Sequence, residues 1–231
     1  FTTDPLSTTT TFYAESIQND CASSTRTAVT VTVDNPVAGN TISGAQEICL
    51  GGTATGLSGS TPTGGDGSGS FTYLWESSAD GATFSSAAGA NSQKEYTPGT
   101  LTADTWFRRK VTSGSCEPSY SNEVKITVTA TISDNTISAA QTVCSGSLPQ
   151  KLTGSLPQGG NSAFAYTWEQ STDGSSFATA PGAVNGQDYS PEALTQSTWF
   201  RRKVTSGSCS VYSNLIKITV EVPIGNNTVA S

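Results

Sequence analysis

Five cysteines are the most reactive side chains of this 231-residue chain, and four of them recur at a fixed spacing. Cys49 and Cys116 are followed 95 and 93 residues later by Cys144 and Cys209. The cysteines are too far apart for a zinc site, and the chain has no histidine. The recurrence predicts two disulfides, Cys49–Cys116 and Cys144–Cys209, each closed within its own copy. Cys21 would then belong to a pair whose other member lies upstream.

Disulfides of this kind would make a large contribution to stability. In the loop-entropy view each would contribute roughly 4 kcal/mol. The apolar fraction of 34% predicts only thin cores, so this contribution would matter. Disulfides also persist in oxidising compartments, and we therefore expect an extracellular protein.

The absence of histidine narrows the catalytic chemistry as well. It removes Ser-His-Asp and Cys-His nucleophile systems and HExxH metalloproteases. Paired carboxylates of the glycosidase kind recur, as Glu76 with Asp80 and as Glu169 with Asp173. Both aspartates precede a glycine, however, and Asp is favoured in such turns for local backbone reasons. We predict that the protein is not an enzyme and has no catalytic residue and no cofactor.

A calcium site and an isopeptide crosslink are two weaker alternatives. Three acidic residues could lie near module ends: Asp104, Glu123 and Asp134. No run of alternating acidic residues resembles a calcium loop, so we expect solvated loop charges and no metal. Lys110 or Lys125 could form an isopeptide bond with Asn122, but the predicted disulfides already supply a covalent crosslink.

The most unusual motif is Trp106-Phe107-Arg108-Arg109-Lys110, which is repeated from Trp199 to Lys203. Alternate residues of a strand point to opposite faces, so Trp106 and Arg108 share one face and Phe107 and Arg109 the other. The second face has more apolar members and is predicted to be the core side, with Arg109 reaching a carboxylate or the sheet edge. Trp106, Arg108 and their copies Trp199 and Arg201 would then form an exposed cation-aromatic ladder or a glycan contact. The opposite assignment, with Trp106 buried, remains open.

These residues must be positioned by short strands, and one strand of each copy carries a regular aromatic pattern. Its residues are Phe71, Tyr73 and Trp75 in the first copy and Phe164, Tyr166 and Trp168 in the second. A period of two places them on one face, where we expect them to form the core. Asp80-Gly81 follows, and Asp-Gly between alternating runs predicts a hairpin.

The repeat, about 93 residues long, sets the domain organisation. About seven short strands per copy, with a tryptophan on a central strand, are typical of an immunoglobulin-like sandwich. We predict an all-β chain of tandem immunoglobulin-like β-sandwich modules of about seven strands, arranged end to end. Residues 1–35 would be the C-terminal remnant of a preceding repeat, 36–131 and 132–223 two full repeats, and 224–231 the start of a following repeat.

Charge and hydropathy exclude two classes of partner. The net charge is -7, and the eleven Lys and Arg residues are spread along the chain, whereas nucleic-acid binding needs a concentrated basic surface. No apolar run approaches the roughly 20 residues of a membrane helix, so no membrane insertion is expected. The N-terminus does not read as a signal peptide, and we expect the chain to begin inside a longer protein.

A family resemblance follows from the ordered motifs of the two copies. They are NTI, a cysteine, YxWxxSxDGxxF, LTxxTWFRRKVTSGSC and SNxxKITV. This order resembles the Ig-like repeats of giant cell-surface adhesins, of the SprB type, that gliding bacteria export by type IX secretion. The resemblance covers nearly the whole chain and carries over no binding residue. It implies a role in surface attachment or gliding motility, with a substratum or polysaccharide as partner beside the neighbouring repeats of the same chain.

Two functional readings result. The first is a non-enzymatic, disulfide-stapled stalk or filament module of a bacterial adhesin. The alternative is a carbohydrate-binding module that recognises polysaccharide through the exposed Trp and Arg side chains.

Overall fold

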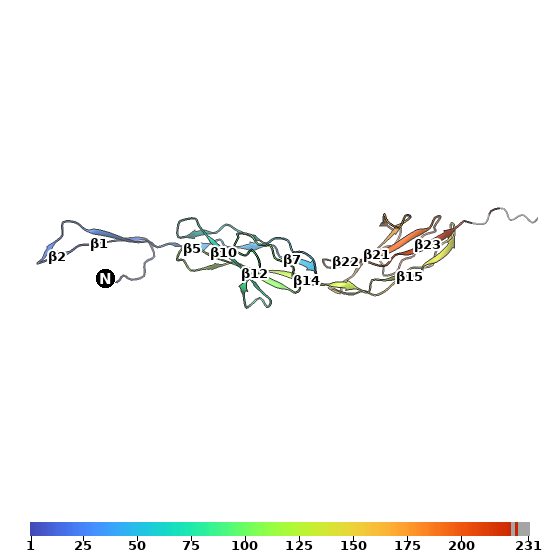
Figure 1. The fold of residues 1–231 in the computed structure, drawn as a ribbon, viewed down its shortest axis with the longest axis horizontal. Helices are drawn as coiled ribbons and strands as arrows, with labels where there is room; N and C mark the ends of the chain where they lie inside the picture. Colours follow the sequence, from blue (N-terminus) through green and yellow to red (C-terminus); the bar gives the residue numbers. More distant parts are fainter. Residues whose placement is uncertain (223–224, 226–231) are drawn as a thin grey trace, which may run out of the picture. The chain divides into compact units, whose positions relative to one another are not determined.

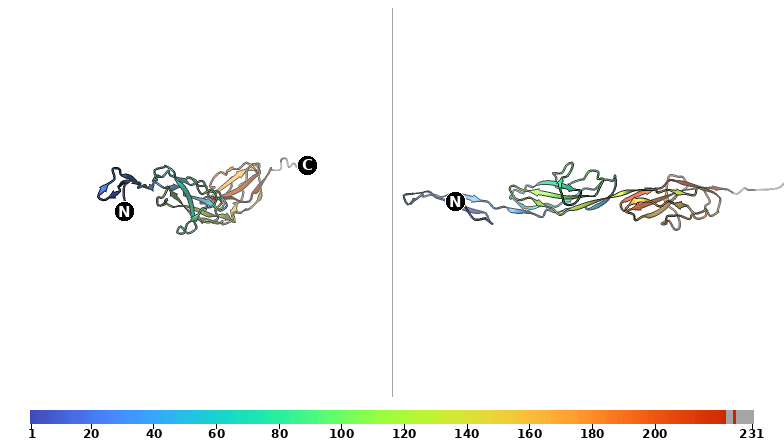
Figure 2. Two further views of the ribbon diagram at one scale, coloured as in Figure 1. Left: turned by 60° about the vertical axis from the view of Figure 1, so that its left-hand side comes forward. Right: turned by 90° about the horizontal axis from the view of Figure 1, so that it is seen from below.

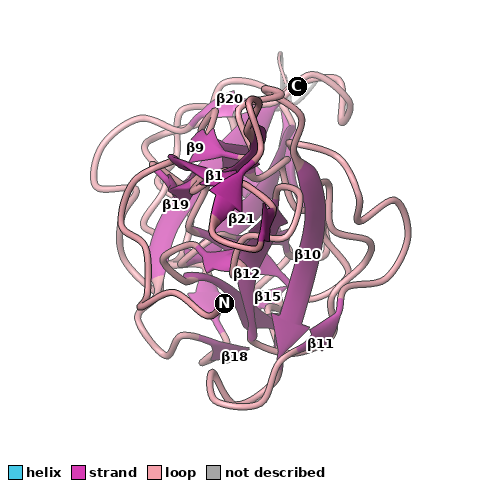
Figure 3. Cartoon of the chain, turned by 90° about the vertical axis from the view of Figure 1, so that its left-hand side faces the viewer, coloured by secondary structure: helices cyan, strands magenta, loops and turns pink. Residues whose placement is uncertain are grey.

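The structure is a computed structural model, and it describes residues 1–222 and 225. These residues form 23 strands. Figure 3 shows strands and loops in the described residues and no helix. Alternating apolar and polar residues, without sustained helical periodicity, account for this. The predicted all-β fold is therefore confirmed. The predicted start of a following repeat, 224–231, lies outside the described residues except for Gly225.

The chain divides into two compact units that do not follow the sequence repeats everywhere. The first unit comprises Phe1–Gln46, Thr53–Thr100 and Asp104–Ile126. The second comprises Glu47–Gly52, Leu101–Ala103 and the chain from Thr127. A short piece of the first repeat, residues 47–52, thus belongs to the second unit.

An N-terminal hairpin, blue in Figures 1 and 2, precedes the first repeat. Its strands are β1 (Thr10–Ala14), β2 (Ile17–Gln18), β3 (Cys21–Ala22) and β4 (Thr27–Val31). β1 pairs antiparallel with β4, and Phe12 lies opposite Val29. Tyr13 and Val29 are exposed, so this two-stranded sheet has no buried core of its own.

The first repeat contains a sheet built around its two long motif strands, labelled in Figure 1. Its strands are β5 (Asn35–Ala38), β6 (Ile42–Ser43), β7 (Gln46–Cys49), β8 (Ser58–Gly59), β9 (Thr63–Gly65), β10 (Thr72–Ser78), β11 (Ser85–Ser86), β12 (Thr105–Thr112), β13 (Ser119–Tyr120) and β14 (Val124–Ser133). One sheet has the order β11-β10-β12-β14-β18, where β18 (Gln158–Gly160) comes from the second repeat, and β13 also pairs with β12 and β7 with β14. The small pairs β5–β9 and β6–β8 lie outside this sheet.

The second repeat has the same plan. Its strands are β15 (Ile137–Ser138), β16 (Gln141–Cys144), β17 (Thr153–Gly154), β18 (Gln158–Gly160), β19 (Ala165–Ser171), β20 (Ala178–Thr179), β21 (Thr198–Ser206), β22 (Cys209–Tyr212) and β23 (Ile216–Glu221). One sheet has the order β16-β23-β21-β19-β20, with β22 also on β21. β16 runs parallel to β23, and every other pair of this sheet is antiparallel. These are immunoglobulin-like β-sandwich domains.

Each core is centred on the tryptophan of the aromatic strand. Trp75 and Trp168 are fully buried. Trp75 stacks on Tyr96 with ring centroids 5.5 Å apart, and its indole N–H donates to the Gln93 carbonyl at 2.9 Å. Trp168 repeats the stacking on Tyr189 at 5.5 Å. The hydrogen bond satisfies the one polar atom of a large apolar side chain.

The other four aromatic residues predicted for the core are only half-buried: Phe71, Tyr73, Phe164 and Tyr166. Tyr73 and Tyr166 lie on the same strand face as the tryptophans but nearer the strand start, and Phe71 and Phe164 come immediately before β10 and β19. Tyr73 lies under the guanidinium of Arg109, 5.1 Å from its ring centroid. The period-two pattern of aromatic residues therefore predicted which strand face points toward the core. It did not predict that only the tryptophans are fully buried.

Candidate functional site

The structure forms one disulfide among the described residues, which include all five cysteines, and it joins Cys49 to Cys209. The Cα atoms are 4.9 Å apart and the sequence separation is 160. Cys21, Cys116 and Cys144 are free thiols. The predicted pairs Cys49–Cys116 and Cys144–Cys209 are therefore wrong. The bond links the early cysteine of the first sequence repeat to the late cysteine of the second.

The second repeat shows why its own two cysteines do not pair. Cys144, the last residue of β16, lies opposite Glu221 of β23. Ile218, three residues before Glu221, lies opposite Thr198, the first residue of β21, so Cys144 lies beyond that end of β21. Cys209 pairs with Ser206, the last residue of β21. Thr198 and Ser206 are eight residues apart, so the two cysteines are separated along the strand by at least about 26 Å at about 3.3 Å per residue. A disulfide needs Cα atoms roughly 4.4–6.8 Å apart. In the first repeat, Cys116 lies in the first compact unit and Cys49 in the second.

The disulfide lies in a partly apolar cluster of the second compact unit. Cys209 is buried with Ile132 and Val204, and Cys49, Phe164 and other half-buried side chains pack against them. The Cys209 sulfur lies 3.3 Å from the Ala130 carbonyl oxygen. Because neighbouring side chains cover it, the bond is part of a small core rather than an exposed link.

Glu47 supports the disulfide from two residues away. Its carboxylate accepts a hydrogen bond from the Thr129 hydroxyl and another from the Ser208 N–H at 3.3 Å. Gly207 has φ 56°, and a Cβ there would lie 2.1 Å from the carboxylate oxygen. Only glycine therefore leaves room for Glu47 to reach the turn before Cys209.

A buried arginine is the principal polar feature of the first repeat. Arg109 is completely buried. Its Nε and Nη2 donate to the Asn40 side-chain oxygen at 3.0 and 2.9 Å. Nη1 donates to the Lys94 carbonyl at 2.9 Å, and Nη2 also donates to the Ser60 carbonyl at 2.9 Å. The expected carboxylate or sheet-edge partner is thus replaced by an amide and two backbone carbonyls.

The second repeat builds the same site around Arg202. Its Nε donates to Asn135 at 3.0 Å, Nη1 to the Gln187 carbonyl at 2.8 Å and Nη2 to the Ser155 carbonyl at 2.9 Å. Burial lowers the pKa of both guanidinium groups below the usual arginine value, and the smaller, opposite effect of the nearby tyrosine does not cancel this shift. The asparagine of the NTI motif is therefore the arginine's partner, a role that was not predicted from the sequence.

The predicted glycan residues lie on the opposite, half-buried face of the same strand. Arg108 donates from Nε to Glu76 at 2.7 Å. Its guanidinium carbon lies 4.2 Å from the Phe84 ring centroid and 4.5 Å from that of Tyr120. The Lys125 ammonium lies 4.5 Å from the Trp106 ring centroid, while the structure buries Phe107, Arg109 and Val111 on the other face.

In the second repeat this cation-aromatic ladder recurs. Arg201 pairs with Glu169 at 2.7 Å, and its guanidinium carbon lies 4.0 Å from the Phe177 ring and 3.9 Å from the Tyr212 ring. Lys217 lies 5.5 Å from the Trp199 ring. Each cation thus already contacts an aromatic ring or a carboxylate of its own repeat.

The carboxylates considered for catalysis do not form a pair. Glu76 is bound to Arg108, whereas Asp80 accepts backbone hydrogen bonds from Ala82 and Thr83, both at 2.8 Å. Backbone and hydroxyl donors lower the pKa of Asp80 to about 2. A carboxyl group held ionised in this way serves a turn and not proton transfer. The Asp80-Gly81 turn joins β10 to β11 through a loop longer than two residues.

The alternatives for a metal and an isopeptide bond gain no support from the geometry. In residues 1–222 and 225, no three His, Cys, Asp or Glu side chains come together as metal ligands. Asn122 exchanges two hydrogen bonds with the backbone of Ile42, at 2.9 and 3.0 Å. Lys125 instead pairs with Asp104 at 2.6 Å.

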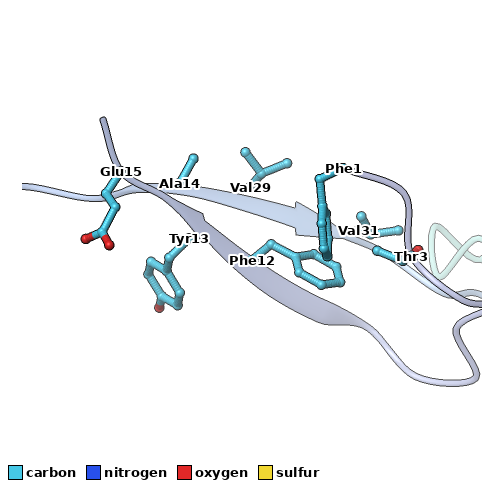
Figure 4. A pocket seen from close by; sticks show the side chains of 8 residues that line it. All are labelled: Phe1, Thr3, Phe12, Tyr13, Ala14, Glu15, Val29 and Val31. Atoms are coloured by element: carbon cyan, nitrogen blue, oxygen red, sulfur yellow. The ribbon is translucent and has the colours of Figure 1, made fainter. Parts of the chain in front are cut away.

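The N-terminal hairpin carries an open apolar hollow, shown in Figure 4. Phe1, Phe12, Val29 and Val31 line it. Phe1 and Phe12 are in edge contact, with centroids 5.7 Å apart.

In the described part of the chain, no helix is long and apolar enough to cross a membrane.

Two family models match the sequence of this chain. A family model described as a domain of unknown function, DUF8696, matches residues 38–130 and again residues 133–222. The chain belongs to this family. A second model, described as an Ig-like domain that is CHU_C associated, matches residues 1–36. No curated protein matches the chain.

Solved structures match this chain over most of its length. Titin domains A168–A170 match with a TM-score of 0.51 at 13% identity, over 90% of this chain and 83% of that one. Murine CEACAM1b matches with a TM-score of 0.39 at 10% identity, over 79% and 100% of the two chains. The fibronectin(III)-like modules of Clostridium thermocellum CbhA match with a TM-score of 0.39 at 11% identity, over 84% and 98%. At 13% identity, the titin match shows the fold alone.

Proposed function

We propose that this chain is a load-bearing stalk segment of a bacterial cell-surface adhesin, related to the SprB-type repeats of gliding bacteria. Tandem Ig-like repeats with a covalent crosslink suit a protein that must span a distance and resist tension. The crosslink also suits an extracellular location, because disulfides persist in oxidising compartments.

The observation that carries this proposal is the position of the Cys49–Cys209 bond. While it is intact, a force applied to the two chain ends passes through the bond. Residues 50–208 then cannot be extended. These residues include β10, β12, β19 and β21, the central strands of both large sheets. The bond therefore shields these central strands from tension.

Single-molecule pulling on the two ends tests this proposal. Under oxidising conditions we expect only the segments outside residues 49–209 to extend. A reductant should add roughly 530 Å of contour, from the separation of 160 residues at about 3.3 Å each. A Cys49→Ser variant should show the long contour under both conditions. Equal contour lengths for the unsubstituted chain with and without reductant would contradict the proposal.

Polysaccharide binding by the ladder residues is the alternative function. A flat, accessible aromatic ring is what a sugar stacks on, but Lys125 already lies over Trp106 and Lys217 over Trp199. We expect that any glycan binding seen on an array is unchanged when Trp106→Ala and Trp199→Ala are introduced together. Binding that the two substitutions abolish, with folding retained, would favour the carbohydrate-binding module instead.

A further inference from the structure

Cys144 has the same backbone environment as Cys49, although its thiol is free and exposed. The residue after each cysteine donates its N–H to the last strand of the same repeat. Leu50 donates to the Thr129 carbonyl at 2.8 Å, and Ser145 donates to the Glu221 carbonyl at 2.9 Å. The two cysteines thus end equivalent strands, β7 and β16, and each of these strands pairs with the strand that closes its repeat, β14 or β23.

The glutamine three residues before each cysteine in sequence confirms the equivalence. Gln46 Nε2 donates to the Gly44 carbonyl at 3.0 Å, and its oxygen accepts from the Thr55 N–H at 2.8 Å. Gln141 makes the same two bonds, to the Ala139 carbonyl at 3.1 Å and from the Gln150 N–H at 2.7 Å. The strand that carries the reactive cysteine is therefore held in the same way in both repeats.

The late cysteines are equivalent as well. The Cys209 sulfur lies 3.3 Å from the Ala130 carbonyl oxygen, and the free Cys116 sulfur lies 3.9 Å from the Asn35 carbonyl oxygen. Ala130 and Asn35 occupy matching sites, opposite Gly160 and Gly65 in their strand pairs. Each repeat thus presents a late cysteine beside the strand that enters it.

We propose that Cys144 is an inter-repeat disulfide site whose partner is the late cysteine of a further copy of this repeat placed after it in the chain. The Cys49–Cys209 bond is the pattern: an early cysteine bonds to the late cysteine of the next repeat. Successive bonds of this kind give overlapping loops along an array. The proposal stands on the crosslink geometry and does not depend on the adhesion role.

The bond forms by thiol-disulfide exchange with an oxidant that is itself a disulfide, such as oxidised glutathione. The Cys144 thiolate attacks this disulfide and releases one glutathione thiolate. The thiolate of the second cysteine then attacks the Cys144 sulfur and releases the second. Two thiols lose two protons and two electrons in all, and the oxidant becomes two thiols.

An extended chain tests the proposal, with residues 131–222 copied directly after Val222. Glu221 and Thr129 are equivalent residues, since each accepts the N–H of the residue after the early cysteine. Thr131 therefore follows Val222 in the extended chain at the same distance from the equivalent residue as it follows Ala130 in the existing junction. Ser210→Ala in the appended copy marks its late cysteine peptide by mass, and Ser210 is exposed. After oxidation with glutathione, free thiols are alkylated and tryptic peptides are mapped without reduction.

We expect Cys144 to change from almost fully alkylated in the 231-residue chain to almost fully crosslinked to the marked peptide in the extended chain. With Cys144→Ser, the marked cysteine should be alkylated instead. The Cys49–Cys209 crosslink reports that the extended chain has folded. If that crosslink forms while Cys144 remains a thiol, the proposal is overturned. It is equally overturned if the Cys49–Cys209 crosslink fails to form, because the pattern itself would then be absent.

Discussion

Arg109 and Asn40 are joined by two hydrogen bonds to one oxygen atom, from Nε at 3.0 Å and from Nη2 at 2.9 Å. The Asn40 amide nitrogen in turn donates to the Arg109 carbonyl at 3.1 Å and to the Ser119 carbonyl at 2.8 Å. The asparagine thus connects a buried cation to the backbone of two strands. No buried side-chain nitrogen or oxygen among the described residues lacks a partner.

Replacing Asn40 by Ala should destabilise the first repeat strongly. Two guanidinium N–H groups would lose the Asn40 oxygen while the charge stays buried, and a hydrogen bond to a charged group contributes about 1.5–3 kcal/mol. Chemical denaturation measures this loss. Asn185→Ala is the control, because Asn185 is exposed, and should change stability by less than about 0.5 kcal/mol. Similar small effects of both substitutions would show that Asn40 does not hold the arginine.

Gly59 should not tolerate a side chain, whereas Gly99 should. A Cβ on Gly59 would lie 1.9 Å from Arg109 Nη1 and 2.4 Å from the Lys94 carbonyl, but one on Gly99 meets nothing within 4 Å. Displacing the buried guanidinium should cost about 3 kcal/mol or more. We expect Gly99→Ala to remain within about 1 kcal/mol of the unsubstituted chain. Equal thermal stability of the two variants would contradict the packing described for Arg109.

The two tryptophans of the first repeat should differ in their contribution to stability. Trp75 is fully buried, and Trp75→Ala should cost about 3–5 kcal/mol. Trp106 is half-buried, and Trp106→Ala should cost about 1–2 kcal/mol because less apolar area is lost. Denaturant melts followed by circular dichroism give both values. A larger loss for Trp106 would mean that the opposite face of β12 forms the core.

Asp80 should make stability depend on acidity. Its pKa in the folded chain is lowered to about 2, chiefly by the Thr83 N–H and then by the Ser78 hydroxyl. The unfolded value is about 3.9, so the folded chain binds fewer protons at this group. The stabilisation is therefore present above about pH 4 and is lost as the pH falls through about 2. The stability difference between the unsubstituted chain and Asp80→Asn should be constant near neutrality and shrink below pH 4. A difference that does not change with pH would contradict this assignment.

The strand pattern was predictable from sequence because it depends on local alternation. Trp75 and Trp168 follow a period of two and lie in the cores. The cysteine pairing was not predictable, because spacings of 95 and 93 residues are the same whether bonds close within a repeat or between successive repeats. Only the strand register, which places Cys144 and Cys209 at opposite ends of β21, distinguishes the two.

The partner of the buried arginine was missed for a different reason, although its place on the core side of the strand was predicted correctly. Asn40 and Arg109 are 69 residues apart, and their contact depends on the third dimension. An arginine between Phe107 and Val111 on a strand face was a signal of burial, since its two neighbours on that face are apolar. The recurrence of Asn, Gly and Arg at matching positions in both repeats was the remaining clue: Asn40, Gly59 and Arg109, then Asn135, Gly154 and Arg202.

Peptide mapping without reduction tests the disulfide directly, because trypsin cleavage after Lys and Arg separates the four cysteines of the two repeats. They fall in residues 27–94, 111–125, 126–151 and 204–217. With free thiols alkylated, the structure predicts that peptide 27–94 is crosslinked to peptide 204–217 and that Cys116 and Cys144 carry the label. A crosslink of 27–94 to 111–125, or of 126–151 to 204–217, would show that each repeat closes its own disulfide and would contradict the account.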